Sequence, residues 1–424
     1  MSIRLYNTLT RNVDPLPEPP GPVRMYICGP TVNARAHIGN ARPFVLGMWL
    51  RSWLRSRGYE AVFVHNITDI NDKIYEAAPG ASAELAERVT KWYLEDTGAF
   101  GLGMPDHLPK ASEMVPQIIR FIEQLIDRGH AYAVDGDVYF RVGHDPEYGH
   151  LSGQRPDQVE EQEPNPLKED PRDFALWKAN KPGEDTWWDS PWGRGRPGWH
   201  IECSVMAEEL LGTQFEIHGG GLDLVFPHHE NELAQSRALG HAFARIWAHN
   251  GILRFTDEKM SKSLGNVVTT DVALEQWGRE TLLLLFLGAH WRKPMDFSEE
   301  TLAQAAARGD RLREVFRNPS EPGPPDAWDR FADALDDDFN TPEALAVMHE
   351  WRDHELLRRA LNVFGLGSLA AREEAPAEVV ELAQRRQRVR AAGDFEEADH
   401  LREQIGAAGW EVRDVADGFR LVRR

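Results

Sequence analysis

The fold is decided by residues 23–66, which read VRMYICGPTVNARAHIGNARPFVLGMWLRSWLRSRGYEAVFVHN. Residues 23–28 have the β-branched and aromatic content of a strand, and Gly29-Pro30 breaks it. A helical period of apolar residues follows over 41–57, with Gly58 as its stop signal. Residues 60–66 form the next predicted strand. This β-α-β opening predicts a parallel sheet with a nucleotide site at the carboxyl ends of its strands.

After residue 105 the alternation of predicted strands and helices is interrupted, and it resumes later in the chain. After residue 105 come a predicted helix over 115–128, a predicted hairpin at Asp135-Gly136-Asp137 and a stretch rich in proline and glutamate, which together look like an insertion. The α/β pattern then resumes, a proline-rich linker covers 319–325, and residues 328–366 are helical in pattern. We therefore expect an α/β protein with a Rossmann-type parallel-sheet domain split by an insertion, then a helical bundle and a small C-terminal module. The expected divisions are 1–105 and 186–265 for the sheet domain, 106–185 for the insertion, 266–318 for the region that follows, 326–370 for the bundle and 378–424 for the module.

Bulk properties favour a cytoplasmic protein of two to four domains. No apolar run approaches the roughly 18 residues of a membrane span. The first residues lack the basic and then apolar pattern of a signal peptide. We expect no membrane association and a monomer.

The net charge of −20 argues against a nucleic-acid partner, because phosphate contacts need lysine and arginine. The uneven distribution of charge along the chain weakens this argument. Residues 384–424 carry nine arginines and eight acidic side chains, a net of +1. The end of the chain is therefore the surface that repels a polyanion least.

Two cysteines in 424 residues, Cys28 and Cys203, argue against a disulfide framework. They are either buried structural thiols or part of a metal or catalytic site. Two thiolates suit zinc, which also takes imidazole and carboxylate ligands.

A histidine and a glutamate suitable for such a site lie in FPHHENE, residues 226–232. If a helix begins at Pro227, His228 and Glu232 share one face at an i, i+4 spacing. The candidate zinc ligands are then Cys28, Cys203, His228 and Glu232. His229 lies i, i+3 from Glu232, so spacing leaves the choice between the two histidines open.

Two short motifs fit the handling of a nucleotide. HIGN at residues 37–40 follows the first strand, where a helix N-terminus would receive phosphate. KMSKS at residues 259–263 offers Lys259 and Lys262 as cations for a triphosphate. In this order, the two motifs resemble the paired signatures of class I aminoacyl-tRNA synthetases.

Within that class the chain resembles the cysteinyl-tRNA synthetase family over nearly its whole length. The matching stretches include MYICGPT (25–31), NITD (66–69), GWHIECS (198–204) and HGGGLD (218–223), together with residues 226–232. Near the end, DDDFNTP (336–342) resembles the start of the family's helical bundle and DFEEAD (394–399) its terminal module.

The resemblance implies activation of L-cysteine with ATP and its transfer to tRNA(Cys). It implies one zinc ion per chain held by the four candidate ligands, and Mg²⁺ accompanying ATP. It implies a stem-contact role for 266–318 and an anticodon-binding role for 378–424. The implied ATP residues are His37, Asn40, Lys259 and Lys262. The implied residues around the amino acid are Gly29, Thr31, Thr68, Trp199 and Asp223.

The chemistry explains such a metal. Cysteine and serine differ by one atom, and an apolar pocket separates near-isosteres by only about 10²-fold. A zinc ion with an open position prefers a thiolate to a hydroxyl and so supplies the missing selectivity.

Two other functions fit parts of the sequence. A cysteine ligase with an amino-sugar acceptor would share the zinc and ATP residues, but it would have no use for the terminal module. A non-catalytic sensor of cysteine or tRNA would be expected to lack a zinc ligand or Lys262, and all of them are present.

Overall fold

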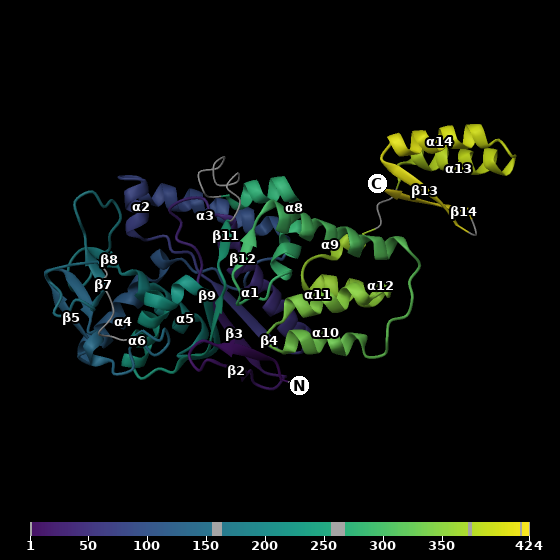
Figure 1. The fold of residues 1–424 in the computed structure, drawn as a ribbon. Coiled ribbons are helices and arrows are strands. Elements are labelled where there is room, and N and C mark those ends of the chain that lie inside the picture. The colour runs from purple at the N-terminus through teal and green to yellow at the C-terminus, as the bar shows by residue number, and fades with distance from the viewer. Residues whose placement is uncertain (1, 155–162, 256–267, 372–374, 416–417, 424) are drawn as a thin grey trace.

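A computed structural model of the protein describes residues 2–154, 163–255, 268–371, 375–415 and 418–423. Figure 1 shows an elongated molecule, with the insertion at one end, the central sheet and green helices in the middle, and the C-terminal module at the other end. No helix within the described ranges is both long and apolar enough to cross a bilayer.

The central sheet has four parallel strands, and the expected β-α-β unit forms half of it. The helix of that unit, α1 (Ile38–Ser56), begins three residues earlier than the apolar period predicted, because His37 caps it. In spatial order the strands are β10 (Phe243–Asn250), β9 (Gln214–Gly221), β3 (Pro22–Ile27) and β4 (Glu60–His65).

Helix α1 joins the sheet to the helices that follow. A Cβ added at Gly47 would lie 2.5 Å from the ring of Phe63, so this glycine permits close packing of the helix on the sheet. On the opposite side, the indole N–H of Trp49 donates to the backbone carbonyl of Phe364, and that of Trp53 donates to Asp336. One apolar core therefore runs from the sheet into the bundle.

The insertion predicted from the change in texture forms a second, antiparallel sheet in the order β5-β6-β7-β8. The predicted hairpin is confirmed: Asp135 and Gly136 have φ values of 49° and 90°, as a two-residue turn between these strands requires. The elements between β4 and β9 are α2 (Asp72–Ala77), α3 (Ser82–Ala99), α4 (Val115–Asp127), β5 (Ala131–Val134), β6 (Asp137–Phe140), β7 (Phe174–Ala179), β8 (Gly195–Pro197) and α5 (Trp199–Leu211).

After β9 the chain is mainly helical. The helical region expected over 328–366 consists of three helices in the structure. The elements are α6 (Glu230–Ala238), β11 (Leu253–Phe255), α8 (Thr270–Leu287), β12 (Met295–Phe297), α9 (Glu299–Arg317), α10 (Ala327–Asp336), α11 (Thr341–Glu350) and α12 (His354–Val363). The expected fold class, a split parallel-sheet domain with a helical bundle and a terminal module, is confirmed.

The C-terminal module has a core of its own. It consists of α13 (Ala377–Ala391), α14 (Phe395–Ala407), β13 (Trp410–Val415) and β14 (Gly418–Arg423). The buried residues of its core are Val379, Ala383, Ile405, Trp410 and Val412. The module reaches α9 through Arg413, which pairs with Glu314 at 2.9 Å, and through Arg420, whose guanidinium donates to the Phe316 carbonyl.

An N-terminal hairpin of β1 (Arg4–Asn7) and β2 (Asn12–Pro15) is fastened to the edge strand β10. The buried amide of Asn7 accepts from the Trp247 N–H and donates to the Arg245 carbonyl, both at 3.0 Å. The N–H of Thr8 donates to the Trp247 carbonyl at 2.9 Å. The hairpin is thereby held against the middle of β10.

Candidate metal and nucleotide site

The two cysteines, distant in sequence, meet where β3 ends. Cys28 directly follows β3, and Cys203 lies in the second turn of α5. Both are buried, and their sulfur atoms are 3.8 Å apart. They are not disulfide-bonded. The two thiols therefore share one buried site, as the ligands of a metal would.

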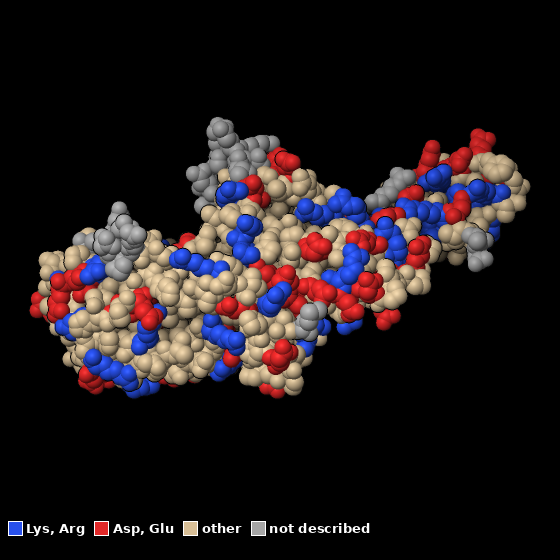
Figure 2. All heavy atoms as spheres, turned by 60° about the horizontal axis from the view of Figure 1, so that its bottom comes forward, with Lys and Arg blue, Asp and Glu red and all other residues tan. Residues whose placement is uncertain are grey.

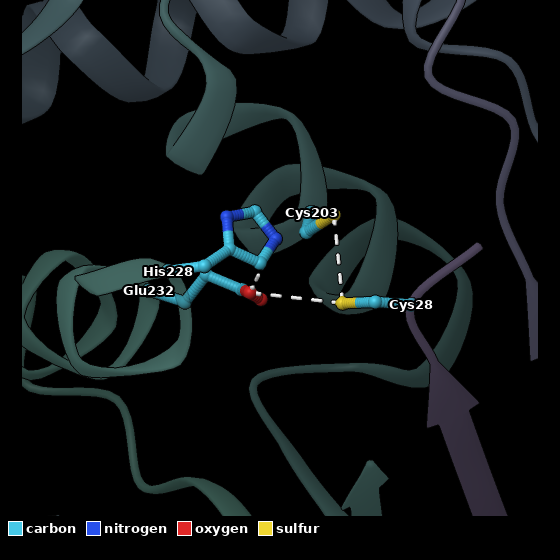
Figure 3. Close-up of side chains that lie close together, drawn as sticks. All are labelled: Cys28, Cys203, His228 and Glu232. Carbon is cyan, nitrogen blue, oxygen red and sulfur yellow. Dashed lines mark hydrogen bonds and ion pairs between the residues drawn. The ribbon is translucent and has the colours of Figure 1, made fainter. Parts of the chain in front are cut away.

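His228 and Glu232 complete this cluster, as Figure 3 shows. An α-helix was expected to begin at Pro227, but residues 225–229 form a wider π-type turn and α6 begins at Glu230. The two side chains still share one face. Nε2 of His228 lies 3.1 Å from Oε1 of Glu232, which is 3.8 Å from Sγ of Cys28.

These distances fit a tetrahedral zinc ion. The four potential ligand atoms lie within 4.8 Å of one another. Zinc–sulfur bonds of about 2.3 Å at tetrahedral angles place two sulfurs about 3.8 Å apart, which is the separation found here. Two thiols, one imidazole and one carboxylate are also the ligand types that zinc takes.

Burial controls the protonation of the cluster. It raises the pKa of Cys28 well above its usual range, with Cys203 as the next cause, and it raises the pKa of Glu232. It also lowers the pKa of His228 well below its usual range. Burial alone thus favours uncharged side chains, and a bound divalent cation is the interaction that favours the thiolate and carboxylate forms.

Two sets of four residues could hold a metal at this point. One contains both cysteines with His228 and Glu232, and the other contains Cys28 and Glu232 with His218 and His229. The set with two sulfurs has the softer donors and takes His228. In that arrangement Nδ1 of His228 faces Nδ1 of His200 at 3.0 Å, and its ring stacks on Trp199 with centroids 4.1 Å apart.

His218 orients the carboxylate. Its Nε2 lies 2.7 Å from Oε2 of Glu232, and its Nδ1 lies 3.1 Å from the Tyr26 carbonyl. Oε2 of Glu232 is thereby held by His218, and Oε1 is turned toward Cys28. Sequence reasoning quoted His218 within a motif but gave it no part in the site.

A cavity of about 680 Å³ opens beside the cluster and carries most of the predicted nucleotide and amino-acid residues. Thr68 is not among the residues that line it: this residue is buried, and its N–H donates to the Pro30 carbonyl at 3.1 Å. Lys259 and Lys262 lie outside the described residues. The predicted residues that do line the cavity are Cys28, Gly29, Thr31, His37, Asn40, Trp199 and Asp223.

Gly29 lines this cavity at a point where two backbone segments approach closely. A Cβ added there would lie 1.7 Å from the backbone oxygen of Asn66. The Gly29 N–H also donates to the Asn66 side chain at 2.8 Å. Only glycine therefore lets the end of β3 lie this close to the segment after β4.

The N-terminus of α1 points into the same cavity. His37 caps the helix, and Asn40 lies in its first turn. The N–H of Ile38 donates to Val268, the first described residue after the segment that holds the two lysines. The positive end of the helix dipole and the flank of the lysine segment thus meet at one edge of the cavity.

Comparison with known proteins first identifies the class of enzyme to which the catalytic domain belongs. Residues 16–307 match the family model of the tRNA synthetases class I (C) catalytic domain, and residues 330–384 match a DALR domain. The fold is similar to that of Mycobacterium tuberculosis methionyl-tRNA synthetase in complex with methionyl-adenylate, with a TM-score of 0.59 and 15% identity over 82% of this chain and 88% of that chain. The molecule has the fold and catalytic domain of a class I aminoacyl-tRNA synthetase.

Full-length relatives narrow the class to a family. The chain is 44% identical to a cysteine–tRNA ligase of Pseudothermotoga lettingae, over 98% of both chains. It is also 44% identical to one of Halorhodospira halophila, over 99% of both. The chain belongs to the cysteinyl-tRNA synthetase family.

Proposed function

We propose that this protein activates L-cysteine with ATP, releases pyrophosphate, and transfers the cysteinyl group to tRNA(Cys). One observation carries the proposal: a buried set of zinc-type ligands opens into the cavity that also receives the N-terminus of α1. A soft metal for a thiol and a helix N-terminus for phosphate lie side by side, as cysteine activation requires. The full-length relatives favour tRNA over an amino-sugar acceptor.

Zinc would be held by Cys28, Cys203, His228 and Glu232. When bound, it supplies a soft Lewis acid that prefers a thiolate to a hydroxyl, which excludes serine. Trp199 stacks on His228 and fixes the imidazole plane, while His218 holds the carboxylate. These side chains orient the ligands, as outer contacts of metal sites do.

The amino acid would lie between the metal cluster and the helix N-terminus. Gly29, Thr31 and Trp199 all line the cavity, where the indole of Trp199 supplies apolar surface. Asp223 lines it too, and its carboxylate would bind the substrate ammonium. Thr68 would act indirectly, because its N–H bonds the Pro30 carbonyl and so holds the backbone between Gly29 and Thr31 in place.

The adenylation step needs no protein nucleophile, because the substrate carboxylate attacks the α-phosphate directly. The protein positions the two reactants and neutralises charge. His37 and Asn40 would face the α-phosphate, and Lys259 and Lys262 would face the β- and γ-phosphates with Mg²⁺.

We assign tRNA binding to the helical part of the chain, with 266–318 at the acceptor stem and 378–424 at the anticodon. Figure 2 shows basic and acidic side chains intermingled on the C-terminal module. Arg385 pairs with Glu397 at 2.6 Å, and Arg386 pairs with Asp414 at 2.7 Å. Arg388 is exposed and has no ion pair within the described part of the chain. It is therefore the first candidate for a phosphate contact.

Cysteine-dependent exchange of pyrophosphate into ATP, measured beside tRNA charging on one preparation, tests the proposal. We expect both activities, with serine failing in the exchange assay. Exchange without charging of any tRNA would redirect the function to a small acceptor, and absence of exchange would overturn it. Light scattering would test the expected monomer.

A further inference from the structure

A chain of hydrogen bonds leads from the N-terminal hairpin to Cys28. The Thr8 hydroxyl oxygen lies 2.7 Å from Nδ1 of His249. The other ring nitrogen of His249, Nε2, lies 2.7 Å from Nδ1 of His229. Nε2 of His229 lies 3.3 Å from Sγ of Cys28. A residue in a turn outside the sheet is thus connected to a proposed zinc ligand by three contacts.

This chain has one consistent arrangement of protons when Cys28 is a thiolate. A thiolate only accepts, so a neutral His229 donates from Nε2 and accepts at Nδ1. His249 then donates from Nε2 and accepts at Nδ1. The donor for that last position is the hydroxyl of Thr8. The thiolate thus fixes the direction of every bond, and the hydroxyl completes the arrangement by donating to the last ring nitrogen.

The contacts are held by rigid parts of the fold. His249 lies on β10, and the Thr8 N–H donates to Trp247 on the same strand. His229 is fully buried, and a Cβ added at Gly220 would lie 3.1 Å from its ring. The missing side chain at Gly220 is what gives the ring its place. A rotation of either imidazole is thus opposed by packing as well as by hydrogen bonds.

We propose that Thr8, acting through His249 and His229, is a positioning residue that directs an N–H donor at the sulfur of Cys28. The proposal rests on the proposed zinc site. A hydrogen bond to a ligating thiolate withdraws charge from it, so the metal becomes a stronger acceptor for the substrate sulfur. In this arrangement His229 is the neighbour of the ligands, and His228 is the ligand.

Loss of the Thr8 hydroxyl removes the donor that favours this tautomer of His249. Nδ1 of His249 would have no donor among the described residues, so its ring could take the opposite tautomer. His229 would then turn an unprotonated Nε2 toward the thiolate, which is repulsive. Thr8→Val removes the hydroxyl and keeps the shape of the side chain, whereas Thr8→Ser keeps the hydroxyl.

A matched control lies in the same hairpin. The Thr10 hydroxyl donates to Asp14 at 2.7 Å and takes no part in the chain of contacts. Thr10→Val therefore tests whether any effect comes from loosening the hairpin. Thr10 is exposed and Thr8 is half-buried, and valine has nearly the shape of threonine, so these variants should fold.

The test uses the full-length chain loaded with Co²⁺ in place of Zn²⁺. In Thr8→Val we expect the sulfur-to-cobalt absorption band to move to longer wavelength, because the thiolate is richer in electrons. We expect the metal dissociation constant, measured by chelator competition, to rise about tenfold, the lower end for outer contacts of metal sites. KM for cysteine should rise while KM for ATP stays constant. Thr8→Ser and Thr10→Val should match the unaltered protein.

The outcomes separate this proposal from the metal site itself. An unaltered protein that binds Co²⁺ with a sulfur band, beside a Thr8→Val variant with the same band and affinity, would overturn the role of Thr8. An equal effect of Thr10→Val would overturn it too, by assigning the change to the hairpin. No sulfur band in the unaltered protein would instead overturn the proposed zinc site.

Discussion

Nδ1 of His37 accepts a hydrogen bond from the backbone N–H of Gly39 at 3.1 Å. In a neutral ring, an accepting Nδ1 leaves the proton on Nε2. Burial lowers the pKa of His37, and the nearby carboxylate of Asp223 only partly opposes that effect. The ring is therefore neutral at pH 7. It caps α1 with Nδ1, and Nε2, which has no hydrogen bond among the described residues, can donate to a phosphate oxygen.

Two substitutions at His37 separate these roles. His37→Ala should remove the cap, at about 1 kcal/mol of unfolding free energy, whereas His37→Ser keeps a capping oxygen. Both remove the Nε2 donor, so both should slow pyrophosphate exchange by about 10²- to 10³-fold. Urea unfolding and exchange kinetics measure the two effects. A serine variant with unchanged exchange would show that His37 only caps the helix.

If the proposed zinc site is correct, Cys203→Ser should lose zinc and affinity for cysteine together. A hydroxyl is a poor zinc ligand, so zinc content should fall from about one per chain and the affinity for cysteine should fall with it. Elemental analysis and KM for cysteine are the measurements. Ser204→Ala is the control, since it alters the adjacent buried residue, whose hydroxyl donates to Gln235 at 2.7 Å. Full zinc occupancy with normal cysteine activation in Cys203→Ser would remove this residue from the site.

His65 should make the fold sensitive to mild acid. Its Nδ1 lies 2.8 Å from the Ile27 carbonyl, its Nε2 lies 2.6 Å from the Tyr93 hydroxyl, and burial lowers its pKa to about 4. The unfolded chain takes up a proton near pH 6.5, but the folded protein does so only near pH 4. Stability is therefore lost as pH falls through this window, by about 2 kcal/mol between pH 7 and pH 5.

His65→Gln gives the measurement. Urea unfolding of both proteins at pH 7 and pH 5 should show a pH dependence shallower by about 2 kcal/mol in the variant. Other buried histidines contribute equally to the two proteins, so the difference isolates His65. Parallel pH dependences would contradict the assignment.

The parts of the fold that the sequence predicted are those set by local patterns. Residues 23–66 alternate between β-branched runs and a helical period, so each segment favours its own structure without help from the rest of the chain. The candidate metal set was predictable for a different reason. Only two cysteines exist, and a histidine and a glutamate at i, i+4 remain on one face even when the turn before α6 is of the π type.

Contacts between distant segments left no such signal. Thr8 and His249 are 241 positions apart, and nothing in the spacing of either indicates the other. The choice between His228 and His229 depends on which of them shares a four-residue set with both cysteines, and spacing in the sequence does not show this. The role of Thr68 at the amino acid stays a prediction: this residue is buried and its N–H bonds the Pro30 carbonyl, a contact that its place in the sequence does not indicate.

The C-terminal module gives the last prediction. Because it has its own core, a truncated chain ending at Pro376 should keep the sheet domain folded while losing the contacts of Arg413 and Arg420 to α9. Cysteine-dependent exchange should survive, while tRNA charging falls steeply and the salt dependence of tRNA affinity flattens.

Within the full chain, Arg388→Ala should reduce the slope of log affinity for tRNA against log salt concentration by about 0.9 or less, the value for one lost phosphate contact. Arg385→Ala is the matched control, since that guanidinium is already paired with Glu397. Equal charging by the truncated and intact proteins would contradict the role assigned to residues 378–424, and equal effects of the two arginine variants would contradict the selection of Arg388.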